Sequence, residues 1–143
     1  MSRENADSTP AIPVLSVRLI VRNDDGQVLI LRRPLNSHGA EGWCLPGGKV
    51  DFGDTAEATV TKELEEETAL TCTKARFLFY QDSLPGEEST MHVVNLYFEC
   101  EAHGEMRLND ESSDSAWITA DDIDEYRMVF RNGEGLRRYW ELS

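Results

Sequence analysis

The stretch GKVDFGDTAEATVTKELEEETAL, residues 48–70, has the clearest pattern in the chain. Asp54 and Thr55 are residue types that cap the N-terminus of a helix, and Glu57 would place a favourable negative charge in the first turn. We therefore expect a helix that runs from Asp54 and Thr55 to about Ala69.

Acidic side chains lie beside the apolar stripe of this expected helix. At about 100° per residue, Ala56 and Leu64 fall within about 40° of Val60 and define the buried side. Glu67 and Glu63 lie on or next to the same stripe. The other charged side chains lie further from the stripe on a helical wheel. Glu66 lies at an intermediate angle, and Lys62 and Glu65 point toward water.

Two interpretations of this acidic run are open. A charge run is usually a solvated helix face. However, carboxylates spaced i,i+3 and i,i+4 repel each other, and a carboxylate beside an apolar stripe loses hydration. A cation bound between them would reverse both penalties, and oxygen-only ligands select Mg²⁺ or Mn²⁺ rather than zinc.

Composition and charge narrow the class of protein. The chain has 143 residues, and we expect a polar lead-in at residues 1–13 followed by a single domain at 14–143. Its 27 Asp and Glu against 14 Lys and Arg give a formal net charge of −13. This excess of acid argues against nucleic-acid polymers and anionic membranes as partners.

The lead-in and the cysteines point to a cytoplasmic protein. Met1–Pro13 is polar, unlike a signal peptide or a membrane helix. Cys44, Cys72 and Cys100 are odd in number and far apart, unlike a disulfide framework or a zinc site. We expect reduced, mostly buried thiols.

The remaining elements indicate an α/β unit in which strands outnumber helices. Asn23–Gly26 predicts a hairpin turn, and the Gly- and Pro-rich residues 34–48 predict a loop. A C-terminal helix is expected to begin at an Asn cap and to dock through apolar side chains. The expected elements are strands at 14–22, 27–33, about 73–82, 91–101 and about 116–118, a loop at 83–89, a helix start at 119–122 and a helix at 132–142.

Residues 48–70 resemble the Nudix box, whose pattern is Gly, five residues, Glu, seven residues, Arg-Glu, an aliphatic residue, any residue, Glu-Glu, any residue, Gly, aliphatic. The matching positions are Gly48, Asp54, Lys62, Glu63, Leu64, Glu66, Glu67, Ala69 and Leu70. The resemblance implies the Nudix fold, an α/β/α sandwich with a mixed β-sheet and the box helix on one face. It also implies a MutT-like Nudix hydrolase, which uses Mg²⁺ to hydrolyse a pyrophosphate bond in a nucleoside diphosphate linked to another group.

Three positions depart from the family pattern. Asp54 stands in place of Glu and Lys62 in place of Arg, so the supporting pair that the family forms there is expected to be looser. Ala69 stands in place of Gly, and a positive φ at that position would strain the helix exit by on the order of 1 kcal/mol. None of the three removes a carboxylate that the family uses for metal binding.

The resemblance also assigns roles to individual residues. Glu63, Glu66 and Glu67 are expected to hold Mg²⁺, with Mn²⁺ as an alternative, and the carbonyl of Gly47 is a further ligand. Glu63, Glu66 and Glu111 are the expected catalytic residues, with Glu63 as the base. Glu111 would be the additional acid that many members take from a later loop, and an ordinary exposed loop acid is the alternative for it.

Basic residues near the box are expected to bind the substrate. Lys49 directly follows the glycine pair, and Arg32 and Arg33 end the second expected strand. Because strand neighbours alternate, one of these arginines should face the site and the other solvent. Four aromatic residues are candidates for stacking on a base, although most are expected in the core: Trp43, Phe79, Tyr80 and Tyr97. Three histidines show no ligand spacing and are expected to be bystanders: His38, His92 and His103.

The substrate is open among a nucleoside triphosphate, ADP-ribose and a nucleotide sugar, and a homodimer is common in the family. Family members that cleave ADP-ribose often carry a proline at about the position of Pro85, so the resemblance favours ADP-ribose slightly. A Pro-Gly pair in a loop is also an ordinary turn. The main alternative is a non-catalytic Nudix module that binds a nucleotide and regulates a partner, but such modules usually lose box carboxylates. An isomerase of the same fold would need a catalytic cysteine that Cys44 does not match, and a plain acidic interaction protein leaves the box spacing unexplained.

Overall fold

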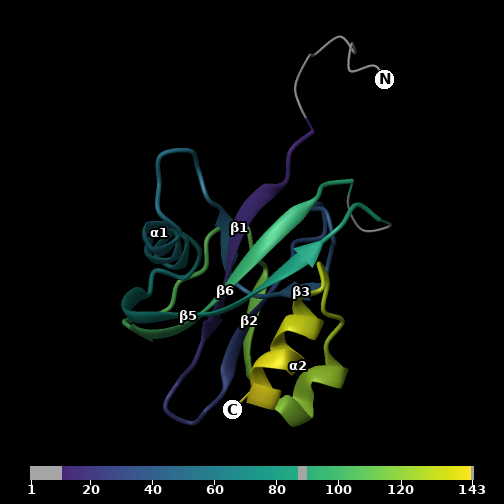
Figure 1. Ribbon diagram of the computed structural model, residues 1–143. Helices are drawn as coiled ribbons and strands as arrows, with labels where there is room; N and C mark the ends of the chain where they lie inside the picture. Colours follow the sequence, from purple (N-terminus) through teal and green to yellow (C-terminus); the bar gives the residue numbers. More distant parts are fainter. Residues whose placement is uncertain (1–10, 87–89, 143) are drawn as a thin grey trace, which may run out of the picture.

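The computed structural model describes residues 11–86 and 90–142. Most of the expected lead-in and residues 87–89 of the expected loop therefore lie outside the described residues. The elements in chain order (Figure 1) are β1 (Val14–Val21), β2 (Val28–Arg32), β3 (Trp43–Cys44), β4 (Gly47–Lys49), α1 (Ala56–Thr68), β5 (Thr71–Ser83), β6 (Val93–His103), β7 (Asp114–Ile118), the 3₁₀ helix η1 (Ala120–Glu125) and α2 (Asn132–Leu142).

The strands form two sheets instead of the one mixed sheet expected. The larger has the order β4-β1-β6-β5, in which β1 and β6 are parallel and the other neighbours antiparallel. The smaller has the order β3-β2-β7 and is antiparallel throughout. The hairpin between β1 and β2 joins the two sheets.

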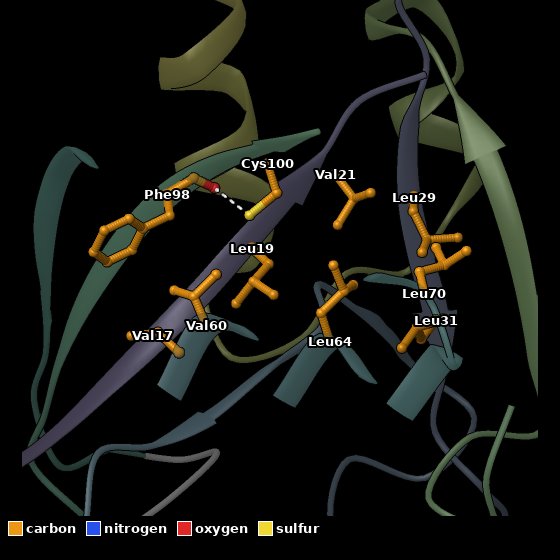
Figure 2. Close-up of a cluster of buried hydrophobic side chains, with 10 residues drawn as sticks. All are labelled: Val17, Leu19, Val21, Leu29, Leu31, Val60, Leu64, Leu70, Phe98 and Cys100. Carbon is orange, nitrogen blue, oxygen red and sulfur yellow. Dashed lines mark hydrogen bonds between the residues drawn. The ribbon is translucent and has the colours of Figure 1, made fainter. Parts of the chain in front are cut away.

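The two helices cover opposite sides of the strands (Figure 1), which confirms the expected α/β/α sandwich. The side chains of β1 contribute to the hydrophobic clusters on both faces of the sheet, because successive side chains of a strand point to opposite faces. Val17, Leu19 and Val21 belong to the cluster under α1 (Figure 2). Ile20 packs in the cluster under α2, with Leu136.

Helix α1 follows its sequence pattern closely. The hydroxyl of Thr55 accepts a hydrogen bond from the Ala58 N–H (3.0 Å), as expected of a cap. Val60 and Leu64 are fully buried. The helix ends at Ala69, whose φ of 64° is left-handed, so the expected strain at this non-glycine exit is present.

Other expectations need correction. Residues 34–48 are not all loop, because they contain β3 and the start of β4, strands too short to give a periodic signal. The helix start at 119–122 does carry a capping box, but it opens only a 3₁₀ helix. Asn132 lies within α2 rather than ahead of it, and its Oδ1 accepts a hydrogen bond from the distant Leu45 N–H (2.7 Å).

The cysteines are unpaired, as expected, with Cys44 and Cys100 buried and Cys72 half-buried. In the described part of the chain, no helix is both long and apolar enough to cross a membrane.

We expect Ala69→Gly to raise the free energy of unfolding by about 0.5–1 kcal/mol. Relief of the left-handed strain of an L-residue is partly offset by the greater freedom of glycine in the unfolded chain. Urea unfolding measures the change. Ala58→Gly, on the exposed side of α1, is the matched control and should lower stability by about 1 kcal/mol. A loss of stability in Ala69→Gly would contradict the strained exit.

Candidate functional site

Three glutamates converge where the C-terminal half of α1 meets β4. Glu67 is only 8% exposed, and its Oε2 accepts a hydrogen bond from the Gly47 N–H (3.3 Å). Glu63 is half-buried and Glu66 is exposed, while Lys62 is also exposed on the helix. The wheel therefore placed Glu67 and Glu63 correctly beside the buried stripe.

The glycine pair of β4 permits this close approach. A Cβ on Gly48 would lie 1.8 Å from Oε1 of Glu63, and a Cβ on Gly47 would lie 2.1 Å from the carbonyl oxygen of Val17. At Gly47 the crowding atom belongs to the backbone of β1, so only glycine fits there. At Gly48 a Cβ would push the Glu63 carboxylate away from the strand.

Crowding of the carboxylates perturbs their protonation. Burial raises the pKa of Glu63 to about 7, and a hydrogen bond with Glu66 and the charges of Glu66 and Glu111 add to the effect. Burial also raises the pKa of Glu67 to about 8, reinforced by the charges of Glu63 and Glu111. Four carboxylates therefore interact, and each added proton or cation relieves the rest.

Glu111 reaches this group from the loop between β6 and β7. The loop is tied to the end of α1 by a hydrogen bond from the Arg107 N–H to the Thr68 carbonyl (2.8 Å). The side chain of Asn109 holds Glu111, accepting from its N–H and donating to its Oε2, both at 3.0 Å. Glu111 is exposed, and it lines the same cavity as Glu67.

That cavity, of about 250 Å³, lies against β1, β4 and β6 and contains acidic, basic and aromatic groups. Glu67, Glu111 and the glycine pair of β4 form its acidic part. Lys49 and Arg33 contribute positive charge to the lining. Arg32 is not part of the lining and instead pairs with Glu41 (3.0 Å), so the two adjacent arginines have different environments.

The aromatic part of the lining differs from expectation. None of the four aromatic candidates lines the cavity; the ring that does is Phe130. The ring of His38 stacks on it, with centroids 5.7 Å apart, and the Arg33 guanidinium lies 5.3 Å from the Phe130 centroid. The structure thus places His38 in the cavity lining, and the expectation that it has no functional role stays a prediction. No local pattern signals this contact, because the two rings come from distant loops.

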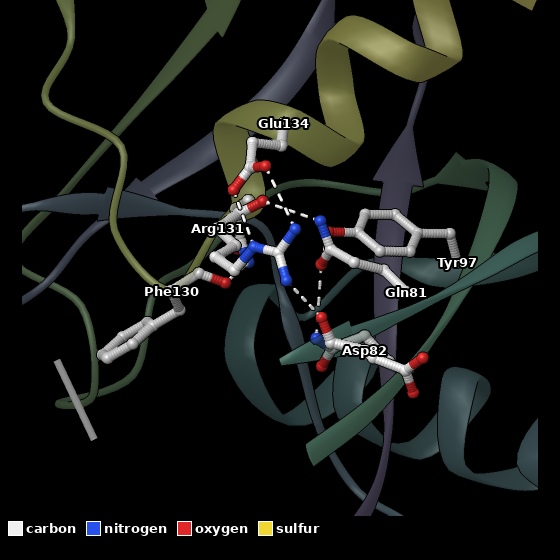
Figure 3. Close-up of polar contacts among 8 residues, drawn as sticks. Gln81, Asp82, Tyr97, Phe130, Arg131 and Glu134 are labelled. Atoms are coloured by element: carbon white, nitrogen blue, oxygen red, sulfur yellow. Dashed lines mark hydrogen bonds and ion pairs between the residues drawn. The ribbon is translucent and has the colours of Figure 1, made fainter. Parts of the chain in front are cut away.

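The turn that presents Phe130 is strained. Phe130 and Arg131 have φ values of 58° and 62°, unusual for residues with large side chains. Figure 3 shows the polar contacts that hold the turn. The Arg131 guanidinium binds Glu134 (2.7 Å) and the carbonyl of Asp82, and the Gln81 amide donates to the Arg131 carbonyl (3.1 Å). Strain maintained by surrounding contacts is typical of functional sites.

The ion pair expected to support the Nudix box forms with a different acidic residue. Lys62 Nζ pairs with Asp51 (3.4 Å), and its other neighbours in the acidic group, Glu66 and Glu63, act on it through charge alone. Asp54 is exposed near the start of α1. The pair expected between Asp54 and Lys62 is thus replaced by a pair between Asp51 and Lys62.

The oxygen-rich, mutually repelling carboxylates fit a hard divalent cation chemically. Glu63 and Glu67 have raised pKa values because their negative charges are buried close together, and a cation would remove that penalty. Within residues 11–86 and 90–142, no three His, Cys, Asp or Glu side chains are gathered closely enough to hold a metal ion.

Comparison with known proteins places this geometry in a family. A family model described as NUDIX domain matches residues 13–139. A MutT-like protein of Streptomyces ambofaciens is 31% identical over 128 residues, covering 87% of this chain and 76% of its own length. An ADP-ribose pyrophosphatase of Methanocaldococcus jannaschii is 29% identical over 128 residues, covering 89% of this chain and 73% of its own.

Among solved structures, the MutT protein from Methanosarcina mazei Go1 superposes with a TM-score of 0.80. The superposition covers 93% of this chain and 97% of that one, at 24% sequence identity, and supports the fold.

The raised pKa of Glu67 predicts how the stability of the metal-free protein depends on pH. A carboxyl group with a pKa of about 8 when folded and an ordinary value of 4.5 when unfolded stabilises the fold most at low pH. This contribution is lost as the pH rises from 4.5 toward 8. We expect Glu67→Gln to abolish the loss, so that the variant exceeds wild type by about 1–3 kcal/mol at the alkaline end.

Urea unfolding in the presence of a chelator, repeated between about pH 5 and pH 8.5, measures the difference between variant and wild type. Glu65→Gln is the matched control, since Glu65 is exposed on the same helix, and its difference from wild type should not change with pH. A Glu67→Gln difference that is equally flat would be inconsistent with a raised pKa.

Proposed function

The chain belongs to the NUDIX domain family and is a Nudix hydrolase acting on nucleotide pyrophosphates, and we propose that it uses Mg²⁺ to cleave the pyrophosphate bond of a nucleoside diphosphate linked to another group. The observation that supports this proposal best is the group formed by Glu63, Glu66, Glu67 and Glu111 beside a cavity that also contains basic and aromatic side chains.

Glu63, Glu66, Glu67 and the carbonyl of Gly47 would hold the divalent cation, for which Mn²⁺ is the alternative. When bound, the cation supplies neutralisation of phosphate oxygens and a lowered pKa for a bound water. Oxygen ligands with repelling charges favour such an ion over zinc.

Glu63 would act as the general base. Its carboxylate accepts a proton from the attacking water while the water oxygen forms a bond to phosphorus and the bridging P–O bond breaks. Carboxylates are among the side chains that serve as general bases, and Glu63 belongs to the same acidic group as the other proposed ligands. Glu111, held by Asn109, would supply the additional acid.

The rest of the lining would orient the substrate. Lys49 and Arg33 would bind phosphate oxygens, because they carry positive charge into the same cavity as the carboxylates. The nucleoside would lie against Phe130 and His38, where an aromatic surface is available for stacking. A nucleoside triphosphate, ADP-ribose and a nucleotide sugar each contain the required linkage, and the relatives include a MutT-like protein and an ADP-ribose pyrophosphatase.

A panel of these substrates with Mg²⁺ tests the proposed reaction. We expect turnover of at least one compound, and a loss of about 10²–10⁴-fold in kcat for Glu63→Gln, since it removes the proposed base. Glu67→Gln should lose activity to a similar extent. Glu65→Gln, exposed on the same helix, should match wild type. Binding of nucleotides without any turnover would favour the non-catalytic module, and full turnover by Glu67→Gln would contradict the role proposed for this carboxylate.

Phe130→Ala is expected to raise KM about tenfold or more with little change in kcat. Loss of base stacking removes about 1–3 kcal/mol of binding that is shared by the ground state and the transition state. Steady-state kinetics on the best substrate give the measurement. Tyr80→Ala, which is 58% exposed and outside the cavity lining, is the control. Equal effects of the two variants would exclude Phe130 as the base platform.

A further inference from the structure

Arg18 of β1 lies in the cavity, although its sequence context carries no signal for a site. Its cross-strand neighbours are Gly47 on β4 and Tyr97 on β6, neither of which carries a negative charge. Nη1 of Arg18 lies 3.1 Å from the place where a Cβ of Gly47 would stand. Arg18 therefore shares the part of the lining formed by Gly47 and Glu67.

The guanidinium of Arg18 is incompletely satisfied. Among the buried side-chain nitrogen and oxygen atoms of the described residues, Nε of Arg18 is the one that lacks a hydrogen-bond partner. Its charge lowers the pKa of Glu67 only as a minor opposing effect, and the two side chains form no ion pair. A buried donor without an acceptor destabilises the fold, so stability does not explain the presence of this arginine.

Half of the eight described arginines outside the cavity form ion pairs with carboxylates. In the described part of the chain, four of them pair with carboxylates at 3.0 Å or less: Arg32 with Glu41, Arg76 with Glu99, Arg131 with Glu134, and Arg137 with Asp124. The cavity cations Arg18, Arg33 and Lys49 take part in none of the ion pairs between described residues. In a chain with 27 acidic residues, three cations without a carboxylate partner around one cavity indicate an anionic ligand.

Building on the proposed function, we propose that Arg18 is a further catalytic residue, which donates from its terminal Nη groups to non-bridging oxygens of the phosphoryl group under attack. The planar guanidinium matches two oxygens of a phosphoryl group, and both hydrogen bonds strengthen as negative charge develops on those oxygens. Arg18 stays protonated throughout. The bond from water to phosphorus forms and the bridging P–O bond breaks while the proton goes to Glu63.

A phosphoryl group suits the position better than a base carbonyl does. Arg18 faces Gly47 and shares its part of the lining with Glu67, the residues assigned to the cation that must touch the scissile phosphate. The aromatic rings available to a base belong to the loops that contain His38 and Phe130. Binding of a base by Arg18 would therefore contradict the proposal.

NMR of arginine Nε–H groups tests the contact directly in the full-length, metal-free chain. Arg18→Lys assigns the Arg18 signal by its disappearance. Inorganic pyrophosphate and a nucleoside triphosphate should each shift this signal, whereas a nucleoside without phosphate should leave it in place. A shift caused by the nucleoside alone would assign Arg18 to base or ribose binding, and no shift with either phosphate compound would remove it from the site; both overturn the proposal.

Kinetics separate a catalytic role from a structural one. Arg18→Met should lower kcat about 10²-fold on the substrate found for wild type, and Arg18→Lys, which keeps the charge but not the fork, should recover part of the loss. Arg18→Met should not unfold at lower urea concentration than wild type, because a buried unsatisfied donor is removed. Arg22 is exposed directly after β1. Arg22→Met is therefore the control, and its kcat and stability should match those of wild type.

The two proposals fail in different ways. Wild-type turnover with undiminished activity in Arg18→Met would overturn the role of Arg18 and leave the hydrolase assignment intact. Absence of wild-type turnover on every nucleotide would contradict the proposed function, while the response of the Nε–H signal to pyrophosphate would still report whether Arg18 binds phosphate.

Discussion

The close contact between the glycine pair of β4 and the last turns of α1 is the constraint on which the site depends. Burial of Val60 and Leu64 against β1 fixes the helix, and the absence of a Cβ at Gly48 lets Glu63 lie directly against the strand. The same packing buries Glu67 beside the Gly47 peptide. Folding therefore crowds these carboxylates at a free-energy cost that a bound cation would relieve, so hydrophobic packing would contribute to the affinity for the proposed ion.

The negative charge of the chain, −13 overall, is compatible with a phosphate substrate because the charges are unevenly distributed. Four of the eight described arginines outside the cavity pair with carboxylates, whereas Arg18, Arg33 and Lys49 line one cavity together without carboxylate partners among the described residues. An acidic surface discourages polyanions, and a small phosphate compound meets local positive charge and a group of acids suited to Mg²⁺.

Local features of the fold could be predicted from the sequence, and long-range ones could not. The cap at Thr55, the buried stripe of α1 and the strained exit at Ala69 depend on neighbouring residues, so periodicity and the box spacing located them. Strands β3 and β4 could not be predicted, because they form by pairing with distant strands and their own Gly- and Pro-rich composition is typical of loops. The positions of Phe130 against His38, and of Arg18 opposite Gly47, likewise arise only when separate loops and strands are assembled.

Packing of α1 on β4 would build a divalent-cation site from Glu63, Glu67 and the Gly47 carbonyl. Crystals soaked in Mn²⁺, with data collected at a wavelength that gives Mn²⁺ a strong anomalous signal, test it most directly. We expect an anomalous peak in contact with the carboxylates of Glu63 and Glu67 and with the Gly47 carbonyl, and the loss of this peak in Glu67→Gln. A peak bound only by residues away from Glu63 and Glu67, or no peak at saturating Mn²⁺, would contradict it.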